Sequence, residues 1–189
     1  MDCADIDTVP AVWLLALRLA LMKRLITFLS LPLYLLDLGT KTWIVRNYEL
    51  HGPDDTIIPN FFWLHHTANT GIAFGLFNGT EYANWAFGAI SLTALLGLAW
   101  AYRKGMFPGP FSRVAVALLI AGILGNLTDR LLHGYVVDFL KFDLHVPFAN
   151  PWPSFNVADS CVVVAACLLG IASFTETPPS TDSKKPSAE

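Results

Sequence analysis

Four long apolar segments determine what this chain can fold into. They run over about residues 25–45, 83–102, 113–132 and 156–174. Each approaches the roughly 20 residues that a helix needs to cross about 30 Å of hydrocarbon, where a helix satisfies its own backbone hydrogen bonds. The chain is 54% hydrophobic and only 14% charged, whereas ordinary soluble domains carry roughly 25% charged residues. The sequence therefore predicts an all-α integral membrane protein with a bundle of four transmembrane helices.

Basic residues indicate how the four predicted spans are oriented. They form clusters before the first span, between the second and third, and after the fourth: Arg18, Lys23 and Arg24; Arg103, Lys104 and Arg113; Lys184 and Lys185. With four spans, all three clusters fall on one side of the membrane. By the positive-inside rule that side is cytoplasmic. Both termini are therefore expected in the cytoplasm, and the loops 46–82 and 133–155 are expected outside.

The chain outside the four-span domain, residues 25–174, is expected to form two further parts. Residues 1–24 form a cytoplasmic N-terminal extension, in which the apolar stretch 11–22 is either an interfacial helix or an extension of the first span. Residues 175–189 are polar and rich in Pro and Ser, which predicts a disordered cytoplasmic tail. In the first outer loop, residues 56–77 mix β-branched and aromatic residues with Gly and Pro. This composition predicts a small β-rich region at the membrane surface.

Charged and amide side chains gather at two span ends that are predicted to lie near the outer face. A charge at the centre of a membrane helix costs roughly 2.5 to 3.5 kcal/mol on insertion scales, so these positions need an explanation. Asn126, Asp129 and Arg130 are spaced i, i+3 and i+4, so they share one helix face. Asn156 and Asp159 are three residues apart where the fourth span begins. The two faces could meet across a helix–helix contact.

Two carboxylates that are brought together can perform acid–base chemistry. They cannot both ionise easily, so one keeps a proton and the pair becomes an acid and a base together, as in aspartic proteases. Asp138 and Asp159 have no obvious basic partner in the sequence, which favours a functional role for them. Asp129 and Arg130 could instead pair with neighbouring groups and simply hold the bundle together.

The remaining polar residues and motifs give no second candidate for a catalytic or metal site. Asp37 and Lys41 are spaced i, i+4 within the first span, which predicts a structural ion pair. There is no GxSxG or HExxH motif, and the histidines lack ligand spacing, so neither a metal nor another cofactor is predicted. The net charge of -3 gives no basic face for nucleic acid. A small proton-coupled transporter or binding protein, with the acids as a relay, stays open as an alternative to an enzyme, as does a structural scaffold.

The loop HTANTGIAFGLF, residues 66–77, combines flexibility with apolar surface. Gly71 and Gly75 let the backbone turn or approach a ligand closely, and the Asn69 amide can both donate and accept. The apolar side chains are those of Ile72, Phe74, Leu76 and Phe77. This pattern suits a loop that lies over a greasy, extended ligand, although an ordinary surface loop with a buried apolar side would share it. The whole outer loop 46–82 is expected to close over such a ligand and to exclude water.

Four stretches together resemble one family. DLGTK, NTGIAFG, GNLTDRLLHGYVVDF and FNVADS occur in the order found in the lipoprotein signal peptidases, the type II signal peptidases of bacteria. The resemblance covers roughly residues 36–174. It implies an aspartic endopeptidase of the bacterial inner membrane, which removes the signal peptide from a prolipoprotein by cleaving before a cysteine that carries diacylglycerol. The implied partners are lipidated prolipoproteins and membrane lipid, the active site faces the periplasm, and the protein is expected to be a monomer.

The resemblance also implies roles for individual residues. The catalytic aspartates of the family match Asp138 and Asp159. The residues assigned to substrate binding and to the polar wall of the site are Asn69, Gly71, Asn126, Asp129, Arg130 and Asn156. Asp37 and Lys41 match the acid and the lysine of the family's first-helix stretch. One departure is Ile72, where the family usually has a second alanine, and this could narrow the fit of the loop.

Overall fold

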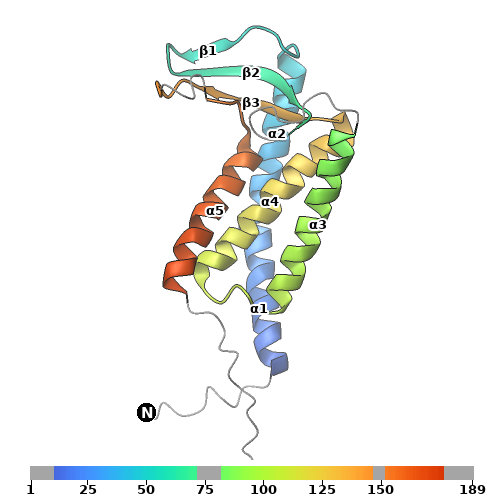
Figure 1. Ribbon diagram of the computed structural model, residues 1–189, viewed down its shortest axis with the longest axis vertical. Coiled ribbons are helices and arrows are strands. Elements are labelled where there is room, and N and C mark those ends of the chain that lie inside the picture. Colours follow the sequence, from blue (N-terminus) through green and yellow to red (C-terminus); the bar gives the residue numbers. More distant parts are fainter. Residues whose placement is uncertain (1–10, 72–81, 147–151, 177–189) are drawn as a thin grey trace, which may run out of the picture.

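Long helices standing side by side carry a small sheet across one end (Figure 1). The computed structural model describes residues 11–71, 82–146 and 152–176. Within these residues, four helices are long and apolar enough to cross a membrane. The predicted four-helix membrane bundle is therefore confirmed at the level of its helices.

The first span belongs to one continuous helical stretch made of three segments. These are α1 (Ala11–Leu25), the π-helical segment η1 (Ile26–Ser30) and α2 (Leu31–Asn47). Pro32 in the first turn of α2 has no N–H to donate to the preceding turn, and a π-helical turn is one way in which a helix absorbs such an interruption. The stretch 11–22, for which the sequence left two possibilities, is helical and runs directly into the span.

Three further helices complete the bundle: α3 (Ala83–Arg103), α4 (Pro110–His133) and α5 (Val157–Thr175). Helix α4 is central, because it contacts α1, η1, α2, α3 and α5. Ser30 in η1 strengthens one of these contacts by donating from Oγ to the backbone oxygen of Ala117 at 2.7 Å. Because α4 is enclosed in this way, any polar side chain on it needs a partner from a neighbouring element.

Two glycines allow α4 to approach its neighbours closely. A Cβ atom at Gly122 would lie 2.6 Å from the backbone oxygen of Ala158, at the start of α5. A Cβ atom at Gly125 would lie 2.5 Å from Oδ2 of Asp37 in α2. Small residues at such positions let membrane helices pack with their backbones close together. They bring α2, α4 and α5 into contact at the level where the polar residues lie.

The sheet is antiparallel, in the order β1 (Asp55–Ile58), β2 (Phe62–Asn69) and β3 (Val136–Phe142). The first two strands lie within or beside the segment 56–77 that the sequence predicts to be β-rich, and residues 72–77 of that segment are outside the described part of the chain. Strand β3 was not predicted from the sequence, and it follows α4 after a turn at Gly134 with φ of 80°. Buried Val137 and Phe139 of β3 pack on Ile44 of α2 and so anchor the sheet to the bundle.

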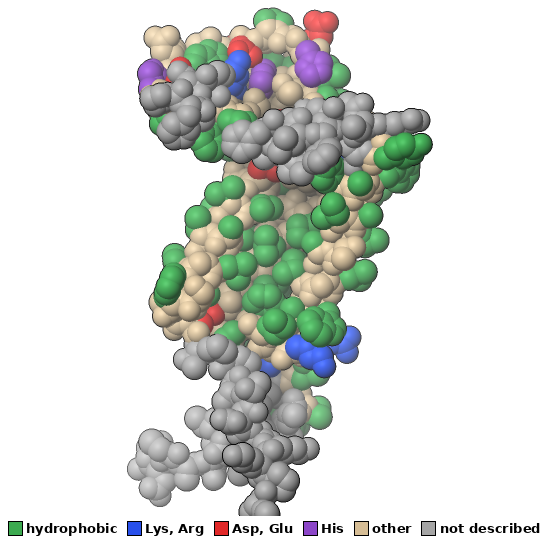
Figure 2. All heavy atoms as spheres, in the orientation of Figure 1, with side chains coloured by type: hydrophobic (Ala, Val, Ile, Leu, Met, Phe, Trp, Pro, Cys, Tyr) green, Lys and Arg blue, Asp and Glu red, His purple; other side chains and the backbone are tan. Residues whose placement is uncertain are grey.

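The surface chemistry changes along the long axis of the molecule. Hydrophobic side chains cover the middle, and a group of Lys and Arg side chains lies at the end opposite to the sheet (Figure 2). Arg103 lies in the last turn of α3 at that end, and Arg18 of α1 lies beside it, since its backbone oxygen accepts from the Tyr102 hydroxyl at 2.7 Å. An exposed apolar belt between two polar ends is the surface expected of a protein that sits in lipid.

Candidate active site

The start of α5 is fixed by a network of hydrogen bonds. Asn156 is the N-cap residue: its Oδ1 accepts from the backbone N–H of Asp159 at 2.8 Å, and Oδ2 of Asp159 accepts from the N–H of Asn156 at 3.2 Å. Oδ1 of Asp37 in α2 accepts from the N–H of Ala158 at 2.8 Å. Several N–H groups that a helix start leaves without an intrahelical partner are thus satisfied. The Asp159 carboxylate is consequently held at the first turn of α5.

Asp138 reaches the same place from the sheet. It lies in β3, paired with Thr67 of β2, and is 3% exposed. Its carboxylate accepts from Nδ2 of Asn69 at 2.9 Å and from Nδ2 of Asn156 at 2.8 Å. The strand itself is tied to the end of α4, because Oδ2 of Asp129 accepts from the N–H of Val137 at 3.0 Å.

Two asparagines connect the aspartates. Asn126 of α4 donates from Nδ2 to Oδ1 of Asp159 at 2.7 Å, and Nδ2 of Asn156 lies 3.2 Å from Oδ1 of Asn126. Asn156 therefore hydrogen-bonds Asp138 through its side chain and Asp159 through its backbone N–H. The two helix faces that could meet according to the sequence do meet. Together with β3 they bring Asp138 and Asp159 into one network, which is buried at Asp138 and Asn156 and half-buried at Asp159 and Asn126.

Lys41 lies beneath this network with three oxygen partners. Its Nζ is 2.8 Å from Oδ2 of Asp37, 2.9 Å from Oδ2 of Asp129 and 3.0 Å from Oδ1 of Asn126. The predicted ion pair of Asp37 and Lys41 is confirmed, whereas the link to Asp129 was not predicted. A buried ammonium group needs such a full set of partners, because an uncompensated charge in the interior is strongly destabilising.

Arg130 positions the turn that follows β2. Its Nη2 lies 3.4 Å from the backbone oxygen of Gly71, and its Nη1 donates to the backbone oxygen of Asn126 at 3.2 Å. The N–H of Gly71 in turn donates to Oδ1 of Asn69 at 3.0 Å, which leaves the Asn69 amide nitrogen free to bond Asp138. The structure therefore gathers all the residues singled out in the sequence into one cluster, apart from Ile72 and the rest of the loop to residue 77, which lie outside the described residues.

The electrostatics of the cluster favour a shared proton. Burial, and then the charge of Asp159, raise the pKa of Asp138 from 3.8 to about 7, although the positive charge of Lys41 opposes this shift. The cluster holds four carboxylates but only the two cations Lys41 and Arg130. A carboxyl group with a pKa near neutrality can both accept and release a proton under physiological conditions. This is the property that an aspartate pair needs for general acid–base chemistry.

The structure also shows neighbours of the site that sequence reasoning missed. His65 in β2 lies between two partners, with Nε2 2.6 Å from Oγ of Ser154 and Nδ1 3.2 Å from Oδ1 of Asp54. It fastens the segment before Asn156 to the sheet. On the other side, Asn84 donates from Nδ2 to the backbone oxygen of Arg130 at 3.2 Å. Neither contact has a local sequence signal, because the partners are far apart in the chain.

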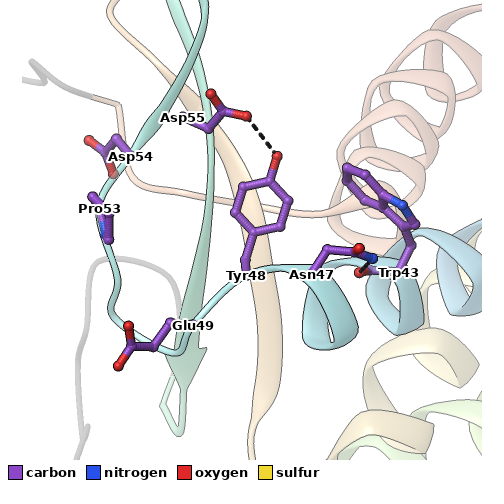
Figure 3. Close-up of a pocket in the computed structure, with 7 residues that line it drawn as sticks. All are labelled: Trp43, Asn47, Tyr48, Glu49, Pro53, Asp54 and Asp55. Atoms are coloured by element: carbon purple, nitrogen blue, oxygen red, sulfur yellow. Dashed lines mark hydrogen bonds between the residues drawn. The ribbon is translucent and has the colours of Figure 1, made fainter.

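A hollow of about 550 Å³ lies at the edge of the sheet, apart from this cluster. It is lined by Trp43, Asn47, Tyr48, Glu49, Pro53, Asp54 and Asp55. The Tyr48 hydroxyl donates to Oδ2 of Asp55 at 3.0 Å across it (Figure 3). None of the residues predicted for the site lines this hollow, so its size alone does not identify the functional centre.

Comparison with known proteins gives one consistent result. A family model described as signal peptidase (SPase) II matches residues 29–175. The lipoprotein signal peptidase of Syntrophotalea carbinolica is 38% identical over 153 residues, which cover 81% of this chain and 92% of that protein. The lipoprotein signal peptidase of Symbiobacterium thermophilum is 37% identical over 141 residues, which cover 75% and 88% of the two chains.

A solved structure agrees with these relatives. It is a bacterial membrane enzyme determined by the in meso method at 2.3 Å resolution, with a TM-score of 0.70 and 28% sequence identity, over 90% of this chain and 95% of that one. These matches do not favour a proton-coupled transporter. The range matched by the family model includes every residue of the buried cluster, and the chain therefore belongs to the signal peptidase II family.

Proposed function

We propose that the chain cleaves prolipoproteins by aspartic endopeptidase chemistry, with Asp138 and Asp159 as the catalytic pair. The family supplies the reaction, which is removal of the signal peptide. The observation that carries the assignment is the position of Asn156, which hydrogen-bonds both carboxylates within one buried network. The cut falls before a cysteine that already carries diacylglycerol.

In this mechanism the pair holds one proton between its two carboxyl groups. The ionised aspartate takes a proton from a water molecule, and the water oxygen bonds to the scissile carbonyl carbon. The protonated aspartate gives its proton to the carbonyl oxygen, which produces a tetrahedral diol. As the C–N bond breaks, the aspartate that took the water proton gives it to the leaving nitrogen, and the other aspartate takes a proton from one hydroxyl of the diol. The pair again holds one proton, and the products are a carboxyl group on the signal peptide and an amino group on the cysteine.

The amide and basic groups around the pair have supporting roles. Asn69, Asn126 and Asn156 donate to the two carboxylates and hold them in place. Arg130 and Gly71 form the side of the site where the backbone of the substrate would lie, since the guanidinium already contacts a backbone oxygen there. Asp129 belongs to the polar wall, and Asp37 with Lys41 supports the network from below.

The proposed site lies at the periplasmic face of the bacterial inner membrane. The Lys and Arg side chains at the end opposite to the sheet support this orientation by the positive-inside rule (Figure 2), with both termini in the cytoplasm. The acyl chains of the substrate can then stay in the bilayer while the scissile bond reaches the aspartates. We further propose that the enzyme works as a monomer and that the outer loop 46–82 closes over the substrate.

The test is cleavage of a diacylglyceryl-modified prolipoprotein by purified protein in detergent. Asp138→Asn and Asp159→Asn should abolish cleavage while thermal unfolding shows that both variants are folded. Asp129→Asn keeps an oxygen that can accept from Val137, and it should retain part of the activity. An active Asp138→Asn enzyme beside an inactive Asp129→Asn enzyme would show that the catalytic pair is Asp129 with Asp159.

A structural role for the aspartates makes a different prediction. It requires that the two asparagine variants unfold at lower temperature and keep their turnover when folded. If wild-type protein cleaves nothing, while a known lipoprotein signal peptidase cleaves the same substrate, the peptidase function itself is wrong.

A further inference from the structure

Lys41 makes more contacts than a structural ion pair requires. Asp37 and Asp129 lie within 2.9 Å of its Nζ on two sides and already compensate its charge. The third contact, to Oδ1 of Asn126 at 3.0 Å, points toward the aspartate pair. It connects the first span to a residue that itself hydrogen-bonds Asp159.

The chemistry of the ammonium group decides how the Asn126 amide is oriented. An ammonium group has donors and no acceptor, so the atom that faces it must be the amide oxygen. The amide nitrogen must then point away, and it lies 2.7 Å from Oδ1 of Asp159, to which it donates. In the reversed orientation the amide oxygen would face Oδ1 of Asp159, and two acceptors would meet whenever Asp159 is ionised.

A second donor supports the same orientation more weakly. Nδ2 of Asn156 lies 3.2 Å from the Asn126 oxygen, but it is closer to Oδ1 of Asp138, at 2.8 Å. Charged donors also form stronger hydrogen bonds than neutral ones. Without Lys41, the Asn126 oxygen would keep only this longer, shared contact.

We propose that Lys41 is a positioning residue for catalysis, which acts on Asp159 by holding Asn126 with its amide nitrogen toward the carboxylate. This inference rests on the proposed assignment of Asp138 and Asp159 as the catalytic pair. It assigns to Lys41 an effect on turnover that is separate from its contribution to stability. Asp37 and Asp129 hold the ammonium group at the required position.

The test is a double-mutant cycle on kcat with Lys41→Met, Asn126→Leu and the double variant. Lys41→Met should lower kcat by about 10- to 100-fold, the range known for outer partners of metal ligands. KM should change little, because Lys41 is buried beside Asp37 and Asp129. In the Asn126→Leu background, Lys41→Met should change kcat by less than about 3-fold, since the residue through which it acts is gone. The melting temperature should fall in both backgrounds, because the ion pairs are lost in both.

Ser30→Ala is the control for lost stability. It removes the buried hydrogen bond from Ser30 Oγ to the backbone oxygen of Ala117 and touches no residue of the cluster. It should lower the melting temperature and keep kcat within about 3-fold of wild type, because no donor to the pair is lost. If Lys41→Met does not fold, the cycle is repeated in an Asp129→Asn background. The variant Lys41→Met/Asp129→Asn then lacks the cation and one carboxylate charge together, and Asp129→Asn alone is its reference.

The results of the cycle and of one further variant, Asp138→Asn, decide between the hypotheses. If Lys41→Met lowers kcat by the same factor with and without Asn126, or leaves kcat unchanged, Lys41 is only structural. An Asp138→Asn variant in the same assay must be inactive. If it is active, the catalytic assignment fails, and if it is inactive while the cycle is additive, only the role of Lys41 is refuted.

Discussion

The ionised carboxylates of the proposed catalytic pair should destabilise the folded protein, and Asp138→Asn should restore part of the lost stability. Because burial and the charge of Asp159 raise the pKa of Asp138 from 3.8 to about 7, the folded protein disfavours the ionised form. A raised pKa of an acid means that the protein is most stable where Asp138 is protonated. It loses stability as the pH rises from about 4 through about 7.

The size of the effect follows from the pKa shift and from the hydrogen bonds. The shift corresponds to about 4 kcal/mol of lost stability above pH 7. Asparagine avoids this loss, but its NH₂ group must face the amide nitrogen of Asn69 or of Asn156, since both donate to Asp138. Asn69 cannot turn over freely, because its oxygen accepts from Gly71. The mismatch costs about 1 to 3 kcal/mol, which leaves a net gain of about 2 kcal/mol.

The assay is thermal unfolding of wild-type protein and Asp138→Asn in detergent between pH 4 and pH 9. For a chain of this length, a gain of about 2 kcal/mol raises the melting temperature by about 4 to 8 °C. The difference should be present at pH 8 and shrink toward pH 4, where the wild-type residue is also uncharged. Equal melting temperatures at all pH values, or a less stable variant at pH 8, would refute the electrostatic reasoning.

Three further predictions concern packing, a helix cap and the pH dependence of activity. In thermal unfolding, Gly125→Ala should lower stability by about 1 to 3 kcal/mol, because its Cβ would meet Asp37. Gly39→Ala, with open space around it, should be neutral or stabilising. Equal effects of the two substitutions would contradict the close packing at Gly125. Burial acts to raise the pKa of Glu176, but hydrogen bonds from the start of α4 outweigh it and leave that pKa lowered. Glu176→Gln should therefore cost about 0.5 to 1 kcal/mol of stability at pH 7. That cost should vanish as the pH falls below about 4, and a pH-independent difference would argue against it. With a pKa of about 7 for Asp138, kcat/KM should decline above pH 7 as the shared proton is lost, and a flat profile to pH 9 would be inconsistent with an acid–base pair.

The helices could be predicted from sequence because hydropathy and length alone identify them. The polar faces could also be predicted, because Asn126, Asp129 and Arg130 follow helical spacing and Asn156 stands three residues before Asp159. That last spacing is also a capping pattern, which could have located the start of α5.

Most contacts between distant segments, apart from the meeting of these two polar faces, were beyond prediction from one sequence. The link from Lys41 to Asp129 depends on how close α2 and α4 come, and this is set by Gly125. The strand that carries Asp138 is rich in β-branched and aromatic residues, a signal that could have identified β3. Its register with β2, which places Asp138 opposite Thr67, is fixed only by the folded sheet.

Helices α4 and α5 are joined at both of their ends. At the sheet end, Asn126 of α4 bonds Asp159 of α5. At the far end, the Glu176 carboxylate accepts from the N–H groups of Gly109, Phe111 and Ser112 at 2.8 to 3.2 Å. The two helices are therefore tied to each other at both ends, and at Gly122 their backbones also lie close together. We expect a lipid-linked substrate to reach the proposed site from another side of the bundle.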